Sequence, residues 1–88
     1  MKLTIVGTGY VGLVTGVCFA EFGYSVTCID KDTARLQKLK SGECPFFEPG
    51  MDKLLDKHIN KTKLLSFASS IKNNSENTDI FFITVGTP

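Results

Sequence analysis

Leu3-Thr4-Ile5-Val6-Gly7-Thr8-Gly9-Tyr10-Val11-Gly12 lies near the start of the chain and predicts most of its architecture. Its first four residues are apolar and rich in β-branched types, and they end at a glycine, which is typical of a buried strand. The next six have the spacing G-x-G-x-x-G. Apolar residues then recur at helical spacing up to Phe22, in two sets: Val11, Val14 and Cys18, and Leu13, Val17 and Ala20. We therefore expect a strand, a glycine-rich turn and a helix.

A second strand follows this helix. Gly23 is placed as a helix C-cap, and Tyr24 to Ile29 form an apolar, β-branched run. Asp30 closes the run and lies 18 positions after Gly12, close to the spacing of about 20 expected of an acid that binds a ribose. Strand, glycine turn, helix, strand and acid together predict a dinucleotide site.

Each residue of this pattern has a physical task. Gly7 permits the tight turn, Gly9 lets the backbone approach a pyrophosphate, and Gly12 lets the helix pack closely on the strand. The helix N-terminus, which begins near Tyr10 and Val11, offers N–H groups and partial positive charge to the pyrophosphate.

The carboxylate of Asp30 can accept two hydrogen bonds from the adenosine ribose and would repel a 2′-phosphate. This favours NAD over NADP, although Lys31 beside it could weaken that preference. The alternative is that the glycines only shape a turn and that Asp30 caps the next helix.

The middle of the chain predicts a second and a third helix. Asp32-Thr33 can cap a helix to about Lys40 that faces inward with Leu36 and Leu39 and ends at Gly42. Arg35 lies one turn into it, and could either contact the adenosine or be a solvated arginine. A third helix is expected from about Met51 to Asn60, with Met51, Leu54, Leu55 and Ile59 on one face. We expect His58, flanked by lysines, at the surface rather than as a general base.

Two further strands are expected. Leu64 to Phe67 is a short strand candidate, and residues 68–78 are polar and weakly helical. Residues 79–85 contain Ile80-Phe81-Phe82-Ile83, a run apolar on both faces that is typical of a central parallel strand. Gly86-Thr87-Pro88 follows the end where ligands sit in open α/β sheets.

Length and charge exclude several classes. The chain has 88 residues and a formal net charge of +1. It can form one small domain, not a two-domain enzyme, and it lacks the basic field that nucleic acid binding needs. Residues 3–20 carry no charge, but glycines as dense as Gly7 and Gly9 break a helix, so we expect no membrane partner.

Three widely spaced cysteines, Cys18, Cys28 and Cys44, form no C-x-x-C pair. This gives no support to a metal site and favours a reducing, cytoplasmic compartment. We expect Cys18 and Cys28 in the core and Cys44 partly exposed.

The expected fold class is α/β: the N-terminal portion of a Rossmann-type doubly wound parallel sheet, with about four strands and intervening helices. Such a domain usually has six strands in two halves. We therefore expect residues 1–88 to be a fragment of an NAD-binding domain, without the catalytic and substrate domains and inactive alone. An uncovered edge beside the last strand would favour self-association, hence a homo-oligomer.

Four motifs together resemble the UDP-glucose/GDP-mannose dehydrogenase family, and in particular its UDP-glucose 6-dehydrogenases. They are the glycine motif extended to Gly16, Cys18-Phe19-Ala20-Glu21, Glu48-Pro49-Gly50-Met51 and Val85-Gly86-Thr87-Pro88. Met51 stands where the family usually has leucine. The resemblance covers all 88 residues but only the start of the family's NAD domain.

The resemblance implies oxidation of UDP-glucose to UDP-glucuronate with two NAD by the longer parent protein, in nucleotide-sugar and polysaccharide synthesis. The family's catalytic residues lie in later segments, so none is assigned here. NAD contacts carry over to Val11, Asp30, Arg35 and Thr87, with Glu48-Pro49-Gly50 as a wall of the same site. Alternatives are another sugar-nucleotide dehydrogenase, a 6-phosphogluconate or hydroxyacyl-CoA type, or a nucleotide-binding module without catalysis.

Overall fold

The computed structural model describes residues 1–44, 49–69 and 78–84. Within these ranges the elements follow in the order β1 (Lys2–Val6), α1 (Tyr10–Glu21), β2 (Ser25–Ile29), α2 (Thr33–Lys40), α3 (Met51–Asp56), the π-helical turn η1 (Lys57–Lys61), β3 (Leu65–Ala68) and β4 (Ile80–Ile83). The alternation of strands and helices is the one predicted from the sequence.

The four described strands form one parallel sheet in the order β3-β2-β1-β4. The register pairs Val6 with both Ile29 and Ile83, and Ile29 with Ala68, so all four strands end at the same level. This is the order of one half of a doubly wound sheet plus the first strand beyond the reversal. The predicted fold class is thus confirmed.

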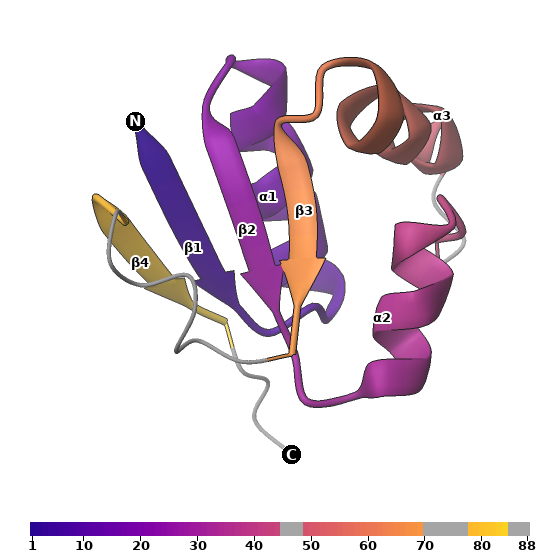
Figure 1. The fold of residues 1–88 in the computed structure, drawn as a ribbon, viewed down its shortest axis with the longest axis horizontal. Coiled ribbons are helices and arrows are strands. Elements are labelled where there is room, and N and C mark those ends of the chain that lie inside the picture. The colour runs from indigo at the N-terminus through magenta and orange to yellow at the C-terminus, as the bar shows by residue number, and fades with distance from the viewer. Residues whose placement is uncertain (45–48, 70–77, 85–88) are drawn as a thin grey trace.

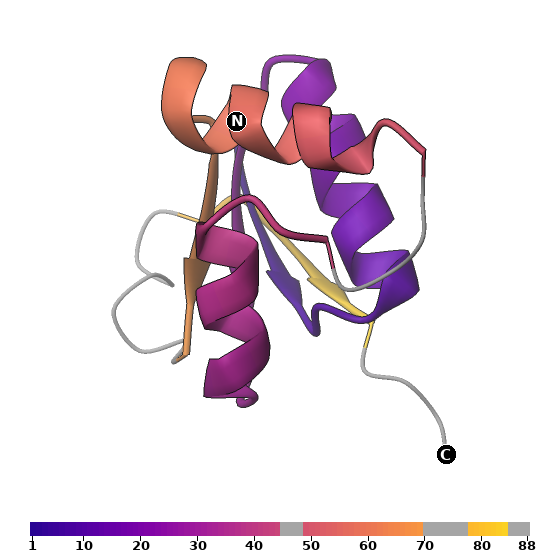
Figure 2. The same ribbon diagram turned by 90° about the vertical axis from the view of Figure 1, so that its right-hand side faces the viewer.

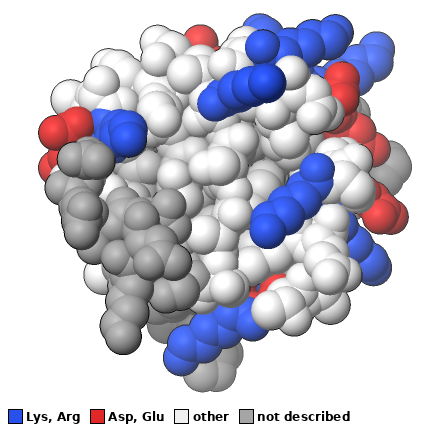
Figure 3. Space-filling view, viewed as in Figure 1, with Lys and Arg blue, Asp and Glu red and all other residues white. Residues whose placement is uncertain are grey.

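Helices cover one face of this sheet. Figure 1 shows α1 behind the strands and α2 beside the β3 end, and Figure 2 shows the same arrangement from the side. No described helix lies over the front of the sheet. That front face carries a row of hydroxyl side chains, Thr4, Thr27 and Ser66, which are paired in register. In Figure 3 the same face is largely uncharged, with lysine and arginine side chains around it.

The core lies between the sheet and α1. Leu3 and Ile5 of β1 pack against Leu13 and Val17 of α1, and all four are at most 2% exposed. The buried side of α1 also carries its two glycines, because they let the helix approach the strands: a Cβ on Gly16 would lie 3.0 Å from Cys28 Sγ.

Cys18 corrects one prediction. We expected it in the core with Cys28, but Cys28 is buried and Cys18 is exposed. Both faces of α1 are apolar, so helical spacing could not choose between them. The glycines Gly12 and Gly16 mark the side that meets the sheet, and Cys18 lies on the other side.

His58 corrects a second prediction, because it is buried and not at the surface. Only 2% of it is exposed. Its Nε2 lies 2.6 Å from Glu21 Oε1 at the end of α1, and its Nδ1 lies 2.9 Å from Thr62 Oγ1. His58 follows Met51 and Leu55 at helical spacing, and both of those are buried. The spacing therefore contained the signal, although the flanking lysines obscured it.

β4 departs from the central position predicted for it. Among the described strands it is last in the order and pairs only with β1. Ile80, Phe81 and Ile83 are consequently exposed, whereas Phe82 packs against the core. The uncovered edge that we expected beside this strand is present in the described sheet.

The remaining element predictions hold within one or two residues. Ala68, expected in a weakly helical stretch, belongs to β3, and the rest of that stretch up to residue 77 lies almost wholly outside the described residues. The described part of the chain contains no helix long and apolar enough to cross a membrane.

Candidate functional site

The common end of the parallel strands brings together residues far apart in sequence. Gly7, Asp30 and Thr84 each follow directly after β1, β2 and β4. The ladder continues one residue further there, since the N–H of Gly7 donates to Ile29 O at 2.7 Å and that of Thr84 to Val6 O at 2.9 Å. The glycine loop and the predicted ribose acid therefore meet at one edge of the sheet, where α/β proteins bind ligands.

The glycine loop has the shape that the motif predicts. Gly7 has a φ of +105°, which only glycine adopts without strain. A Cβ on Gly12 would lie 2.1 Å from Gly7 O and 2.4 Å from Thr84 Oγ1, so α1 could not begin this close to the loop with any other residue.

Gly9 is open. It is the N-cap of α1 with a φ of −67°, and a Cβ placed on it would meet nothing within 4 Å. The fold itself has room for a side chain there. A ligand that approaches the backbone would occupy that room, as the pyrophosphate role of the second motif glycine requires.

The start of α1 is suited to a negative group. The first intrahelical bond runs from the Leu13 N–H to Gly9 O, and the N–H groups of the first turn have no acceptor within a helix. No acidic side chain lies in this first turn. Tyr10 and Val11 are exposed there. The partial positive charge of the helix end therefore suits a negatively charged ligand.

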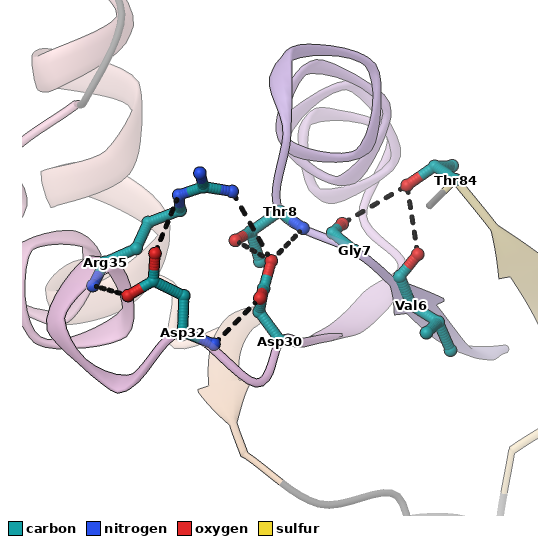
Figure 4. Close-up of polar contacts among 7 residues, drawn as sticks. All are labelled: Val6, Gly7, Thr8, Asp30, Asp32, Arg35 and Thr84. Carbon is teal, nitrogen blue, oxygen red and sulfur yellow. Dashed lines mark hydrogen bonds and ion pairs between the residues drawn. The ribbon is translucent and has the colours of Figure 1, made fainter. Parts of the chain in front are cut away.

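Asp30 faces the loop and is tied to it (Figure 4). Its Oδ2 accepts from the Thr8 N–H at 2.8 Å and from the Thr8 hydroxyl at 2.6 Å. Its Oδ1 accepts from the Asp32 N–H at 2.9 Å. Burial raises the pKa of Asp30, but these hydrogen bonds and the nearby Arg35 outweigh it, so the pKa lies below its ordinary value.

The neighbouring charges are Asp32 and Arg35. Arg35 Nη1 lies 3.6 Å from Asp30 Oδ2, and its Nε lies 3.9 Å from Asp32 Oδ2. Two carboxylates thus face one guanidinium, which leaves the cluster negative. Arg35 is half-buried against Asp30 rather than a fully solvated arginine.

Asp32, not Asp30, caps α2: its Oδ1 accepts from the Arg35 N–H at 3.0 Å. The alternative in which Asp30 is only a helix cap is therefore wrong, and its carboxylate belongs to the glycine loop.

Thr84 is a site residue that the motifs did not single out. Its hydroxyl lies 3.1 Å from Val6 O and 3.2 Å from Gly7 O, so it donates to carbonyls at the turn itself. The signal was weak: a hydroxyl residue at the end of an apolar strand, just before the Val-Gly-Thr-Pro motif.

Several other predictions fall outside the site or outside the described residues. Thr87 and Glu48 belong to the ranges that the structure does not describe. Burial raises the pKa of the Cys28 thiol to about 12, which makes it unreactive at neutral pH. In the described ranges no group of three or more potential metal ligands is found.

Comparison with known proteins gives the same assignment. The sequence model of the UDP-glucose/GDP-mannose dehydrogenase family, NAD binding domain, matches residues 1–88. A UDP-glucose 6-dehydrogenase of Rhizobium meliloti (strain 1021) is 48% identical over 88 residues, which is all of this chain and 20% of that protein.

Solved structures agree with the fold. A UDP-glucose dehydrogenase from Pyrobaculum islandicum superimposes with a TM-score of 0.90 at 37% identity, over 99% of this chain and 20% of that one. A GDP-mannose dehydrogenase from Pseudomonas aeruginosa gives 0.93 at 34% identity, over 100% of this chain and 20% of that one.

This chain therefore spans about one fifth of the length of the relatives it matches. NAD is the cofactor that the family match implies. The glycine loop and the sheet order agree with the sequence match, and the chain belongs to the UDP-glucose/GDP-mannose dehydrogenase family, in the part that forms its NAD-binding domain.

Proposed function

We propose that residues 1–88 hold the ADP portion of NAD for a longer sugar-nucleotide dehydrogenase. The pyrophosphate would lie over Gly9 and the start of α1, and the adenosine ribose would donate to Asp30. The observation that carries this proposal is the open space at Gly9 next to a carboxylate already fixed in place.

Each group has a separate part in this binding. The backbone at Gly9, Tyr10, Val11 and Gly12 would receive the pyrophosphate, with Gly7 shaping the turn. The negative cluster around Asp30 would reject a 2′-phosphate, which favours NAD over NADP. Arg35 is proposed to flank the adenosine from α2, and Thr87 to line the dinucleotide.

We further propose that the parent oxidises UDP-glucose to UDP-glucuronate with two NAD, which accept the hydrides, in the cytoplasm. The UDP-glucose 6-dehydrogenases among the relatives support this substrate. The solved GDP-mannose and UDP-N-acetylmannosamine dehydrogenases represent the second candidate. Assaying NAD reduction by the full-length parent with UDP-glucose, GDP-mannose and UDP-N-acetylmannosamine decides between them. Residues 1–88 alone should reduce NAD with none.

Gly9→Ala tests the cofactor site in the 88-residue chain. The backbone of Gly9 suits alanine and its Cβ meets nothing, but alanine is a poorer N-cap than glycine, so the two effects offset and the free energy of unfolding should change by less than about 1 kcal/mol. NAD binding, followed by amide NMR titration, should weaken by about tenfold or more, because the methyl group occupies the pyrophosphate position.

Gly12→Ala is the contrasting variant. Its methyl group collides with Gly7 O, so it should lose stability and binding together. If Gly9→Ala is stable and binds NAD as the wild type does, the pyrophosphate does not lie over Gly9 and the proposal is wrong.

A further inference from the structure

Thr8 belongs to the glycine motif but has no role in the NAD binding proposed above. It lies between Gly7 and Gly9, and none of its surface is exposed. It donates twice to one atom: its N–H lies 2.8 Å and its hydroxyl 2.6 Å from Asp30 Oδ2. Figure 4 shows the side chain turned toward that carboxylate.

These bonds divide the two oxygens of Asp30 into different roles. A carboxylate offers about four lone-pair positions. Both positions on Oδ2 are taken by Thr8, with the guanidinium of Arg35 also 3.6 Å away. The Asp32 N–H occupies one lone-pair position on Oδ1, at 2.9 Å. One position on Oδ1 therefore remains for a ribose hydroxyl, not the two that the isolated side chain would offer.

We propose that Thr8 is the positioning residue for adenosine ribose recognition: it holds Oδ2 of Asp30, so that Oδ1 stays available to one ribose hydroxyl. This inference rests on the proposed NAD function.

The hydroxyl matters beyond the N–H. The N–H would remain with any residue but proline at position 8, and it is a single anchor about which the carboxylate can turn. The hydroxyl is a second donor from a different direction, which fixes the carboxylate plane. Without the hydroxyl, the carboxylate of Asp30 can turn away from the ribose and toward the guanidinium of Arg35, which lies 3.6 Å from Oδ2.

Thr8→Val removes the hydroxyl at nearly constant shape. The probes are ADP and 2′,3′-dideoxy-ADP, whose dissociation constants are measured by NMR titration of the 88-residue chain. The wild type should prefer ADP by about tenfold, the value of one good hydrogen bond to a charged group. In Thr8→Val this preference should fall to about threefold or less, while dideoxy-ADP binds as before. Thr8→Ser, which keeps the hydroxyl, should restore it.

Thr4→Val is the matched control. Thr4 is equally buried, on β1, and its hydroxyl lies 2.6 Å from Thr78 Oγ1, remote from Asp30. Thr4→Val also removes a threonine hydroxyl hydrogen bond, in this case to another hydroxyl, yet it should keep the preference for ADP. A second readout is the pKa of the Asp30 carboxyl from its NMR titration, which should rise in Thr8→Val and stay constant in Thr4→Val. If Thr8→Val does not fold, Thr8→Ala takes its place.

The outcomes separate the two claims. A wild type that binds neither nucleotide overturns the proposed function and this inference with it. A wild type that prefers ADP, together with a Thr8→Val variant that prefers it equally, leaves the function standing and overturns the role of Thr8. An equal loss of affinity for both nucleotides in Thr8→Val also overturns it, because the effect is then on the loop and not on ribose recognition.

Discussion

Asp30 shows how one side chain joins binding and stability. Its carboxylate is mostly buried and accepts hydrogen bonds from the loop after β1 and from the turn before α2. Such charge-assisted bonds are each worth more than neutral ones. The group that we propose to receive the ribose is therefore also a link between two segments of the fold, and its charge can be tested without any ligand.

The stability of the chain should depend on the charge of Asp30. Because its pKa is lowered in the folded state, the ionised group stabilises the fold above its unfolded pKa of about 4. This contribution is lost as the pH falls through the folded-state value. Asp30→Asn should cost about 1–3 kcal/mol at pH 7, and the gap to the wild type should shrink below pH ~4.

Urea unfolding at pH 7 and at pH 3 measures this gap. Asp32→Asn is the control, since it removes a neighbouring charge but asparagine caps a helix as well as aspartate does. It should cost less than Asp30→Asn at pH 7. A gap for Asp30→Asn that stays the same at both pH values would contradict the role of the charge.

Residue types and spacing were enough to predict the shape of the glycine loop and the position of Asp30 near it. Gly7, Gly9, Gly12 and Asp30 stand where the motif placed them, because each task admits only one or two residue types. Thr8 and Thr84 were missed since many residue types fit a variable motif position or a strand end. Their role depends on a partner oxygen that only the fold brings near.

At the level of elements, His58 connects α1 to the segment formed by α3 and η1. It bridges Glu21 and Thr62, and Lys57 Nζ also lies 3.0 Å from Glu21 Oε1. Hydrogen bonds from His58 and Lys57 hold the pKa of Glu21 below its ordinary value. The end of the first helix is thereby fixed to a turn 36 and 37 residues later.

His58→Ala should lower the free energy of unfolding by about 2–4 kcal/mol, because it leaves a cavity in place of the buried imidazole and removes its hydrogen bonds to Glu21 and Thr62. Asn60→Ala, two residues later and exposed, is the control and should change it by less than about 0.5 kcal/mol. Thermal or urea unfolding measures both. Equal effects of the two variants would show that the bridge contributes nothing.

The bounds of the helices and strands were well predicted, but which side of a helix is buried was not. α1 began and ended where glycines and apolar spacing indicated, yet Cys18 and Val11 proved to be on its exposed side. Local patterns record which residues can form a helix. Which side is buried depends on the neighbouring strands, and a helix apolar on both sides contains little information about them.

For the molecule as a whole, the edge beside β4 is the open surface of the described sheet. β4 exposes Phe81 and Ile83, and the described helices lie elsewhere. The sequence predicted the free edge beside β4, but its apolar run also predicted that β4 is a central strand. Both expectations fit a doubly wound sheet that continues past β4, and we propose that in the parent protein a further strand pairs there.

The isolated chain should self-associate through this edge. Ile83→Lys, at a side chain that is 73% exposed, should shift the chain toward monomer at high concentration with little change in stability. Phe22→Lys, equally exposed but after α1, is the control and should leave association unchanged. Sedimentation velocity over a range of concentrations measures both. A wild type that stays monomeric throughout would contradict the prediction.

The hydrogen bonds of Thr84 also set the earliest moment at which the glycine loop of a growing chain can be complete. The Thr84 hydroxyl reaches the carbonyls of Gly7 and Val6 across 77 and 78 residues of sequence. Ribosomes add about 5–20 residues per second, so a newly made Gly7 waits for several seconds before its last partner emerges. A nascent chain cannot complete the loop any sooner. If the loop is where NAD binds, we expect the cofactor to stabilise the complete loop only after residue 84 has emerged and reached the carbonyls of Val6 and Gly7.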